Sequence, residues 1–500
     1  MVSHPTTRSC FVPAAVILTA GVTRPVLAQT VTFQELYTFN GDRAGDELGV
    51  CVSGVGDVNG DGFDDLIVGA SGDDNNGTQS GSARVFSGLD GSVLFTVNGD
   101  NANDYFGYSV SGAGDVNGDG FNDFIVGATG DDNNGTRSGS ARVFSGSDAS
   151  VLFTFNGDSE LDFFGGSVSC AGDVNGDGFA DLIVGANGDD NNGSRSGSAR
   201  VFSGADGSVL FTFNGDNSDD FFGRSVSDAG DVNGDGFADL IAGAFGNDEN
   251  GNYAGSARVF SGADGSVLYN FYGDNGYDLF GFSVSGAGDV DGDGFDDLIV
   301  GAAGADNGGT ARVYSGADGS VIYNFNGDST GDFFGRSVSL AGDVNGDGFD
   351  DLVVGAYYDD NIGNDSGSAR VFSGADGSVL ATLYGDNAGD LFGHSVSGAG
   401  DVNGDGFDDL IIGARYDDNT GTNSGSARVF ISVVTPPSRL CADQNEDGQV
   451  TPADFSAWVA NFNTLNLVAD VNQDSFVTPA DFSAWVAAFN QGESGPTCVP

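Results

Sequence analysis

The sequence predicts an all-β seven-bladed β-propeller followed by a small C-terminal α-helical domain. An acidic, glycine-rich stretch first seen at residues 57–65 recurs seven times, at intervals of 58 residues except for one of 54. Each period holds four short β-type segments separated by Gly and Asp turns, which is the pattern of a propeller blade. Two twelve-residue acidic loops near the C-terminus, each running into an amphipathic segment, predict the helical domain.

Composition narrows the classes of function. The chain has 500 residues and a formal net charge of −57, and all 16 of its basic residues are arginine. This charge repels phosphates, so nucleic acid is excluded as a partner. The 40 Phe residues supply apolar material for a core, so the 85 Gly residues are interpreted as turns rather than disorder. The regular placement of the acidic residues favours cation binding over solubility alone.

The N-terminus has the pattern of an export signal. Arg8 provides the positive region, residues 11–22 are largely apolar, and the segment 26–28 offers a cleavage site before Gln29. Residues 1–28 are therefore predicted to be a signal peptide. No later stretch is long and apolar enough to span a membrane, so a secreted, extracellular or cell-surface protein is expected.

The second repeat shows the four strands of a blade in order. Residues 106–111 alternate between apolar and polar side chains and form the first strand, which precedes an acidic loop. Residues 123–128 are a continuous apolar segment typical of a buried strand. Residues 140–144 and 151–155 form the third and fourth strands, joined by a short turn. We refer to these four positions as strands A to D.

The ends of the repeat array predict how the ring closes. Strands A and C occur seven times, but strand D follows only the first six copies of strand C. A segment at 35–42 matches the D strand at 152–158, and it stands before the first repeat. This N-terminal strand is predicted to complete the seventh blade, which removes an exposed edge. The propeller is predicted to span residues 33–432, with a shortened surface loop at 303–309.

Each acidic loop has the alternating ligands of a calcium site. In the first loop Asp57, Asn59, Asp61 and Asp65 offer side-chain oxygens, and Phe63 offers its carbonyl oxygen while its side chain is expected in the core. No Cys or His lies nearby, which disfavours zinc. About seven Ca²⁺ ions are therefore expected in the propeller. The equivalent residues are Asp115, Asn117, Asp119, Phe121, Asp123; Asp173, Asn175, Asp177, Phe179, Asp181; Asp231, Asn233, Asp235, Phe237, Asp239; Asp289, Asp291, Asp293, Phe295, Asp297; Asp343, Asn345, Asp347, Phe349, Asp351; and Asp401, Asn403, Asp405, Phe407, Asp409.

Other polar positions of the repeat are not predicted to bind metal. The residue after the loop Phe varies between copies, from Asp64 to Asn122 and Ala180. A second acidic loop, at 73–76 in the first repeat, lacks the ligand alternation and is expected to be a polar, solvated turn.

The repeat resembles the FG-GAP repeat of integrin α-subunit propellers and their bacterial relatives. The residues that carry the resemblance are the Phe-Gly pair (Phe164 and Gly165 in the third copy), the Asp/Asn loop and the apolar segment 183–186. The Pro that ends the family's motif is replaced in this chain. The resemblance implies adhesion or ligand binding, with a protein or glycan ligand on the face opposite the calcium loops. The loops expected there, such as 131–138 and 189–196, are nearly identical between blades, so no single specialised pocket is expected.

The C-terminal part is predicted to hold a linker at 433–440 and a separate domain at 441–500. Its two loops match the EF-hand positions 1, 3, 5, 7, 9 and 12, and Ser475 in place of Gly leaves open whether the second loop binds metal. The duplicated loop–helix pair resembles a dockerin, which implies a cohesin-like or cell-envelope partner and up to two further Ca²⁺ ions. Whether Cys441 and Cys498 form a disulfide stays open. The predicted ligands are Asp443, Asn445, Asp447, Gln449, Thr451, Asp454, Asp470, Asn472, Asp474, Phe476, Thr478 and Asp481.

Together these patterns predict a secreted calcium-binding propeller that binds a ligand and is docked to a partner by its tail. The alternatives are an extracellular polysaccharide-degrading enzyme component and a purely structural cell-envelope protein. We expect no enzyme activity, because His394 is the one His of the mature chain and stands at a variable repeat position, where it is interpreted as a packing or surface residue. Cys51 and Cys170 occupy non-equivalent positions and are interpreted as small buried residues rather than a pair.

Overall fold

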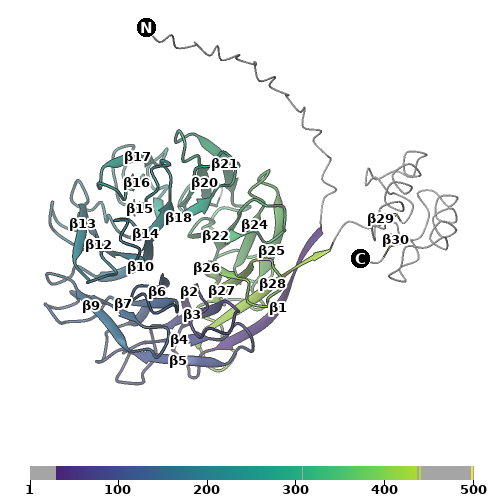
Figure 1. Ribbon diagram of the computed structural model, residues 1–500, viewed down its shortest axis with the longest axis horizontal. Coiled ribbons are helices and arrows are strands. Elements are labelled where there is room, and N and C mark those ends of the chain that lie inside the picture. Colours follow the sequence, from purple (N-terminus) through teal and green to yellow (C-terminus); the bar gives the residue numbers. More distant parts are fainter. Residues whose placement is uncertain (1–29, 307, 436–438, 441–496, 499–500) are drawn as a thin grey trace, which may run out of the picture. The chain divides into compact units, whose positions relative to one another are not determined.

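The computed structural model describes residues 30–306, 308–435, 439–440 and 497–498, and these residues form strands and no helix. One compact unit comprises Val31–Thr435. It consists of seven four-stranded sheets arranged in a ring (Figure 1). The predicted seven-bladed propeller is therefore confirmed. The predicted C-terminal helical domain lies outside the described residues.

The two inner positions of each blade are strands A and B, and the acidic loop connects them. The innermost strands are β2 (Leu48–Gly56), β6 (Phe106–Gly114), β10 (Phe164–Gly172), β14 (Ser225–Gly230), β18 (Phe280–Gly288), β22 (Ser337–Gly342) and β26 (Phe392–Gly400). The second strands are β3 (Asp65–Ala70), β7 (Asp123–Ala128), β11 (Asp181–Ala186), β15 (Asp239–Ala244), β19 (Asp297–Ala302), β23 (Asp351–Ala356) and β27 (Asp409–Ala414).

The two outer positions are strands C and D, and each pairs antiparallel with its neighbour within the blade. The third strands are β4 (Ser82–Phe86), β8 (Ser140–Phe144), β12 (Ser198–Phe202), β16 (Ser256–Phe260), β20 (Thr310–Tyr314), β24 (Ser368–Phe372) and β28 (Ser426–Thr435). The outermost strands are β5 (Val93–Asn98), β9 (Val151–Asn156), β13 (Val209–Asn214), β17 (Val267–Tyr272), β21 (Val321–Asn326), β25 (Val379–Tyr384) and β1 (Thr30–Asn40).

The N-terminal strand closes the ring as predicted. The seventh sheet has the order β1-β28-β27-β26, so its outermost strand comes from the start of the chain. The Thr32 hydroxyl donates to the carbonyl of Val433 (3.4 Å), and the amide of Gly41 donates to the carbonyl of Gly425 (3.0 Å). These pairs show that β1 and β28 run antiparallel. β28, which would otherwise be an edge strand, is thereby covered on both sides.

The hydrophobic core lies between blades rather than within one central cluster. The described residues form seven buried clusters, and each combines side chains of two adjacent blades. Strand B is buried along its whole length, which explains its continuous apolar sequence. The cluster between the seventh and first blades contains Phe39 of β1. The Phe39 ring stacks on the Phe86 ring, with 3.8 Å between the ring centres. Closure of the ring therefore buries the same kind of core as every other blade junction.

Two glycines of each repeat allow neighbouring blades to approach closely. A Cβ on Gly127 of β7 would lie 2.0 Å from the carbonyl oxygen of Gly165 in β10. Such a contact is too short for any side chain, and a Cβ on Gly165 would lie 2.2 Å from the Ser140 carbonyl oxygen. The Gly before the last residue of strand B and the Gly of the Phe-Gly pair are therefore both required. The repeat motif thus encodes the spacing between blades.

Polar contacts also join neighbouring blades. The Ser395 hydroxyl of β26 accepts a hydrogen bond from the Val52 amide of β2 (3.1 Å), and the same contact recurs at four other junctions. Cys51 takes the serine position in the first blade, and its sulfur lies 3.4 Å from the Val110 amide nitrogen. Cys51 and Cys170 are free thiols, as expected.

The second unit contains a two-stranded pair among its described residues. β29 (Arg439–Leu440) pairs antiparallel with β30 (Thr497–Cys498). The two ends of the C-terminal segment therefore meet. Cys441 lies outside the described residues, so the question of a disulfide with Cys498 stays open. No helix in the described part of the chain is long and apolar enough to cross a membrane.

Candidate metal loops and the pocket on the opposite face

The aspartate at the first loop position organises the acidic turn. Asp57 accepts hydrogen bonds from the amides of Gly60 (2.6 Å) and Asp61 (3.1 Å) on Oδ1, and from Gly62 (2.9 Å) on Oδ2. Gly60 has a φ of +77°, in the left-handed region that Gly adopts without strain. These bonds hold the loop in a tight turn and keep its carboxylates and amide side chains together.

The aspartate at the ninth position is the buried member of the set. Asp65 is fully buried, and its two oxygens accept hydrogen bonds from the amides of Val58 (3.1 Å) and Gly88 (3.0 Å). Burial, together with the smaller effect of the nearby charges of Asp61 and Asp57, raises its pKa to about 6. The contact with Gly88 also places the acidic loop and the C–D turn on one face, as predicted. Equivalent burial raises the pKa to about 6 in Asp123, Asp181 and Asp239, to about 7 in Asp297, and to about 8 in Asp351 and Asp409.

The fifth loop fits a divalent cation on its own chemistry. Here Asp291 replaces the Asn of the other loops, and carboxylate oxygens of Asp289, Asp291 and Asp297 lie within 4.8 Å of one another. In the first loop the Asn59 amide instead donates to the Asp65 carboxylate (3.2 Å). Three hard oxygen ligands without such a donor suit Ca²⁺. A bound cation would offset the cost of burying these charges.

The loop Phe does not enter the core, contrary to the expectation. Phe63 is half-buried, and a Cβ on Gly404 of the preceding loop would lie 2.7 Å from its Cε1. The fully buried residue is Val58, at the second loop position, which joins the core between the first two blades. Alternate residues of the loop point to opposite sides, so Asp57 and Asn59 point to one side and Val58 to the other. Val58 therefore anchors the loop in the core, and the Phe63 ring covers the acidic loop of the adjacent blade.

Two polar positions have structural functions that the sequence did not reveal. The Asp64 carboxylate accepts a hydrogen bond from the Asp401 amide of the preceding loop (3.0 Å). In the second acidic loop Asp73 is buried, and it accepts a hydrogen bond from the Ser82 hydroxyl (2.7 Å). The expectation of a solvated turn is therefore wrong for Asp73, although Asp74 is exposed.

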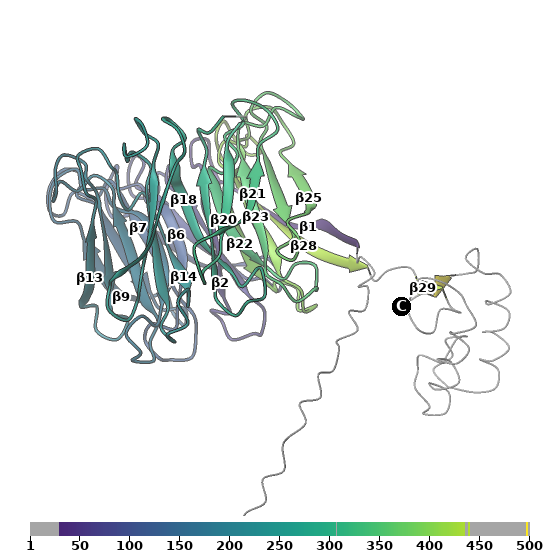
Figure 2. The same ribbon diagram turned by 90° about the horizontal axis from the view of Figure 1, so that it is seen from above.

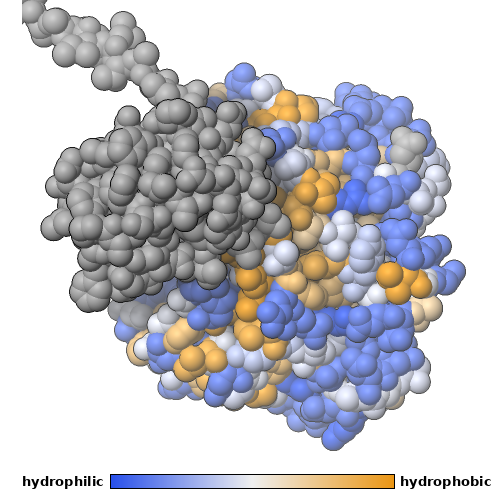
Figure 3. Space-filling view, turned by 90° about the vertical axis from the view of Figure 1, so that its right-hand side faces the viewer, coloured by the Kyte–Doolittle hydropathy of each residue, from blue (hydrophilic) through white to orange (hydrophobic). Residues whose placement is uncertain are grey.

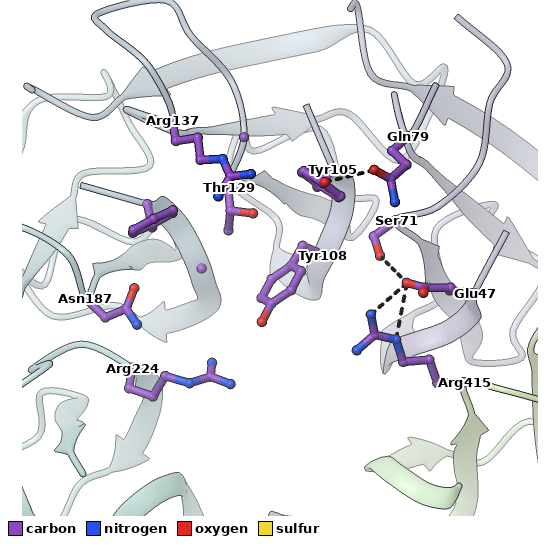
Figure 4. Close-up of a pocket in the computed structure, with 13 residues that line it drawn as sticks. Glu47, Ser71, Gln79, Tyr105, Tyr108, Thr129, Arg137, Asn187, Arg224 and Arg415 are labelled. Atoms are coloured by element: carbon purple, nitrogen blue, oxygen red, sulfur yellow. Dashed lines mark hydrogen bonds and ion pairs between the residues drawn. The ribbon is translucent and has the colours of Figure 1, made fainter. Parts of the chain in front are cut away.

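The opposite face contains a pocket of about 410 Å³. It is lined by residues that follow strand B or belong to the B–C and D–A loops, together with strand A residues of the second to fourth blades (Figure 4). Below it, a cavity of about 160 Å³ is bounded by innermost strands from all seven blades. The side view in Figure 2 shows the strands running between the two loop faces. The expectation of no specialised pocket is therefore wrong.

The pocket gathers the positions at which the seven repeats differ. The residue after the Phe-Gly pair is Tyr108 in the second blade and Arg224 in the fourth, and the residue after strand B is Thr129 in the second blade and Arg415 in the seventh. Sequence comparison between the repeats could have found this site, because these positions vary in an otherwise uniform array. Tyr105 and Phe163 also line it, in left-handed conformations with φ of 53° and 52°. The equivalent residue has a φ of 52–56° in every blade, so this conformation belongs to the D–A turn of the repeat.

The side chains that line the pocket carry a net positive charge, although the chain as a whole is strongly acidic. Figure 4 shows Tyr108 pointing into the space between the Arg224 and Arg415 side chains. The Arg224 charge lowers the pKa of Tyr108 below its usual value, against the effect of burial. Arg415 is paired with Glu47 (2.7 Å). Burial, followed by repulsion from Arg224, lowers the pKa of Arg336 to about 10, so it stays charged at neutral pH.

His394 lines the central cavity as a packing residue. Its Nδ1–H donates to the Val50 carbonyl (3.2 Å), and its ring packs edge-on against Tyr357. Burial, then the charges of Arg336 and Arg415, lower its pKa well below the usual range. This environment agrees with the expected packing role.

Comparison with known protein families matches the FG-GAP repeat to seven segments, one in each blade: 52–86, 106–144, 164–202, 222–260, 280–323, 334–372 and 392–430. The segments begin in or beside strand A; five of them end at the last residue of strand C, and the segment 392–430 ends within β28. The chain belongs to the FG-GAP repeat family. The predicted EF-hand ligands at 443–454 and 470–481 lie outside both these segments and the described residues.

Individual relatives of this FG-GAP chain include integrin α subunits. The chain is 35% identical over 167 residues to integrin alpha pat-2 of Caenorhabditis elegans, covering 29% of this chain and 13% of that protein. It is 33% identical over 144 residues to chicken (Gallus gallus) integrin alpha-V, covering 27% and 14%. It is 33% identical over 226 residues to integrin alpha-5 of Xenopus laevis, covering 39% and 21%. The matches therefore span only a small part of these relatives.

Proposed function

We propose that this protein is a secreted, calcium-stabilised propeller that acts as an adhesion or ligand-binding module. The observation that carries this proposal is the contrast between the two faces. One face repeats the same acidic loop seven times, whereas the opposite face has a pocket built from residues that differ between blades. A uniform ring suits a structural function, and a varied pocket suits recognition.

The cation function rests on the loop chemistry and on the family. In the first loop the ligands would be Asp57, Asn59, Asp61, the Phe63 carbonyl and Asp65. Bound Ca²⁺ would supply the positive charge that offsets these carboxylates, which makes the ions structural rather than part of a reaction. The relatives named as integrin α subunits support a protein or glycan ligand on the face opposite the loops.

The tail is proposed to dock the propeller to a partner. The support is the spacing of the two EF-hand-type loops and the resemblance to dockerins. The partner would be cohesin-like or part of the cell envelope. Comparing the full chain with a chain that ends at Thr435 in a pull-down from cell-envelope extract tests this proposal. Equal capture by both chains would contradict it.

The ligand-binding function is tested by presenting the full chain to a panel of extracellular glycans and matrix proteins, in Ca²⁺ and in chelator. We expect binding in Ca²⁺ and its loss in chelator. Absence of binding to the whole panel would count against a recognition module. Release of products from any bound polysaccharide would contradict our expectation that the protein is not an enzyme.

A further inference from the structure

Most arginines of the propeller already have a structural partner. Each strand C carries one, which pairs with an aspartate of the preceding D–A loop: Arg142 with Asp100 at 2.7 Å and Arg84 with Asp42 at 2.7 Å. The Arg142 guanidinium also lies over the Phe106 ring, 5.1 Å from its centre. These arginines stabilise the blade junctions and are not free for a ligand.

Three other arginines gather on the pocket face without a carboxylate partner. Arg137 and Arg224 line the pocket, and Arg224 and Arg336 line the cavity below it. None of the three makes an ion pair with another described residue. The guanidinium carbons of Arg224 and Arg336 lie 4.6 Å and 3.9 Å from the centre of the same ring, that of Phe282. Two partly buried cations against one ring repel each other, and an anion bound next to them would offset this repulsion.

The rest of the pocket wall is neutral overall, because Glu47 is paired with Arg415, and it includes flat aromatic surfaces. Tyr105 and Phe163 contribute rings, and Thr129, Asn187 and Gln79 contribute hydroxyl and amide groups. The Tyr105 hydroxyl donates to the Gln79 side-chain oxygen (2.9 Å), which fixes both groups at the wall (Figure 4). This combination suits a ligand with both an apolar ring face and several hydroxyl groups.

A row of aromatic rings leads away from the arginines across the fourth blade. Phe282 packs against Phe245 (5.3 Å between ring centres), Phe245 neighbours Tyr253 (6.2 Å), and Tyr253 stacks on Tyr277 (6.3 Å). Tyr277 is 65% exposed, which is unusual for a large aromatic residue. The row could carry several units of an extended ligand.

We propose that this pocket, together with the cavity below it, binds an acidic polysaccharide, with uronic acid carboxylates held by Arg224, which lines both, and by Arg336 of the cavity. The adjacent pyranose ring then lies against the pocket aromatics, and further sugar units follow the row toward Tyr277. This inference rests on the proposed function and names the ligand chemistry of the same face. Guanidinium groups bind carboxylates through paired hydrogen bonds, which provides the selectivity for acidic over neutral sugars.

The wall chemistry favours a saccharide over an acidic peptide. Asp and Glu side chains carry the carboxylate but offer neither a pyranose face nor clustered hydroxyl groups to Thr129, Asn187 and Gln79. The surrounding protein is strongly acidic, so long-range attraction to a polyanion is absent and contact inside the pocket must provide the binding.

Calorimetric titration of the full chain in Ca²⁺ tests the proposal with three probes: oligomers of glucuronic acid, oligomers of glucose and poly-glutamate. We expect glucuronic acid oligomers to bind at least roughly 10-fold more tightly than the other two. Arg224→Gln and Arg336→Gln should each weaken this binding by roughly 10-fold. Tyr277→Ala should weaken binding of long oligomers and leave that of glucuronic acid itself unchanged.

Arg43→Gln is the matched control, because Arg43 is exposed, makes no ion pair with the described residues and lines neither pocket nor cavity. It removes the same charge and should leave binding unchanged. Unchanged thermal unfolding of each variant shows that any loss is local. Equal binding of glucose oligomers or of poly-glutamate, or an equal loss in Arg43→Gln, would overturn the proposal. Binding of a different ligand with normal calcium dependence would leave the proposed function standing.

Discussion

At the residue level, the acidic loop is a turn held by its own side chains. Asp57 accepts three backbone hydrogen bonds, and Val58 anchors the loop in the core. The loop therefore holds much of its shape through contacts within the chain. Such pre-organisation lowers the entropic cost of binding an ion.

Substitution of two glycines in this loop tests backbone strain and steric contact separately. Gly60 (φ +77°) faces the Phe121 ring, which a Cβ would approach to 2.9 Å, whereas a Cβ on Gly62 (φ +90°) would meet nothing within 4 Å. Gly62→Ala should therefore cost about 1 kcal/mol of unfolding free energy, from strain alone. Gly60→Ala should cost about 1–2 kcal/mol more, because Phe121 must move. Thermal unfolding of both variants in Ca²⁺ checks the order, and equal losses would contradict the contact.

Asp228, on the innermost strand of the fourth blade, gives a pH-dependent prediction. Burial, then the charge of Asp296, raises its pKa to about 6, and Cys170 is its other titratable neighbour. A raised carboxyl pKa means that the folded state prefers the protonated form, so this contribution to stability is lost as the pH rises from about 4 to about 6. Asp228→Asn should be more stable than the parent by about 1–3 kcal/mol at pH 7.

Urea unfolding of Asp228→Asn and the parent protein at several pH values measures this difference. The advantage of the variant should shrink toward pH 4, because the folded parent then carries a protonated, uncharged carboxyl. An advantage that does not change with pH would show that charge is not its cause.

The residue types and their spacing predicted which loop residues offer ligand atoms. They did not predict the direction of every loop side chain. The alternation of Asp57, Asn59 and Asp61 was visible in the sequence, whereas Phe63 was expected in the core and instead covers the neighbouring loop. That contact joins residues of the first and seventh blades, and no local pattern contains it. The ligand positions themselves stay a prediction.

At the level of elements, β1 gives the most direct test of ring closure. A chain without residues 30–40 would expose the edge of β28 and remove Phe39 from its cluster. We expect a lower unfolding temperature and self-association of this variant, because an unpaired edge strand recruits other strands. Light scattering and thermal unfolding measure both effects.

A synthetic peptide of residues 30–42 should restore the stability of the truncated chain when added in trans. The same peptide with Phe39→Ala should restore less, since it cannot fill the position against Phe86. No difference between the two peptides would mean that backbone pairing alone closes the ring.

The strands were predictable because each blade repeats the same hydrophobic pattern and turn residues. Strand B reads as a continuous apolar segment because both of its faces contact neighbouring blades. The orphan N-terminal strand was found by counting strands, which needs no knowledge of contacts. The pocket was not predicted, because the loops expected on this face are nearly uniform, whereas the residues that differ between blades lie at strand ends.

At the level of the whole molecule, the dominant feature is charge. With a net charge of −57, the seven loops concentrate carboxylates on one face. We expect chelator to lower the unfolding temperature by more than about 10 °C, because several bound ions are lost together. Differential scanning calorimetry in Ca²⁺ and in chelator checks this, with Mg²⁺ re-addition as the control for selectivity.

Added salt should recover part of that loss, since it screens repulsion between exposed carboxylates. An unfolding temperature unaffected by chelator would refute calcium as a structural ion. The fold follows from the repeats alone, but the count of bound ions does not, because loop sequence and ion occupancy are separate properties.

The position of β28 between β1 and β27 has a mechanical consequence for a tethered module. Tension applied through the chain beyond Thr435 would enter the propeller through a strand that is hydrogen-bonded on both sides. Where that tension is directed along the strand, the hydrogen bonds on both of its sides are loaded together in shear and do not break one at a time. A ligand held on the pocket face and an anchored tail would thus load the seventh blade at a strand that has a paired neighbour on each side. The N-terminal strand would serve as the clamp that keeps a pulled propeller from unravelling.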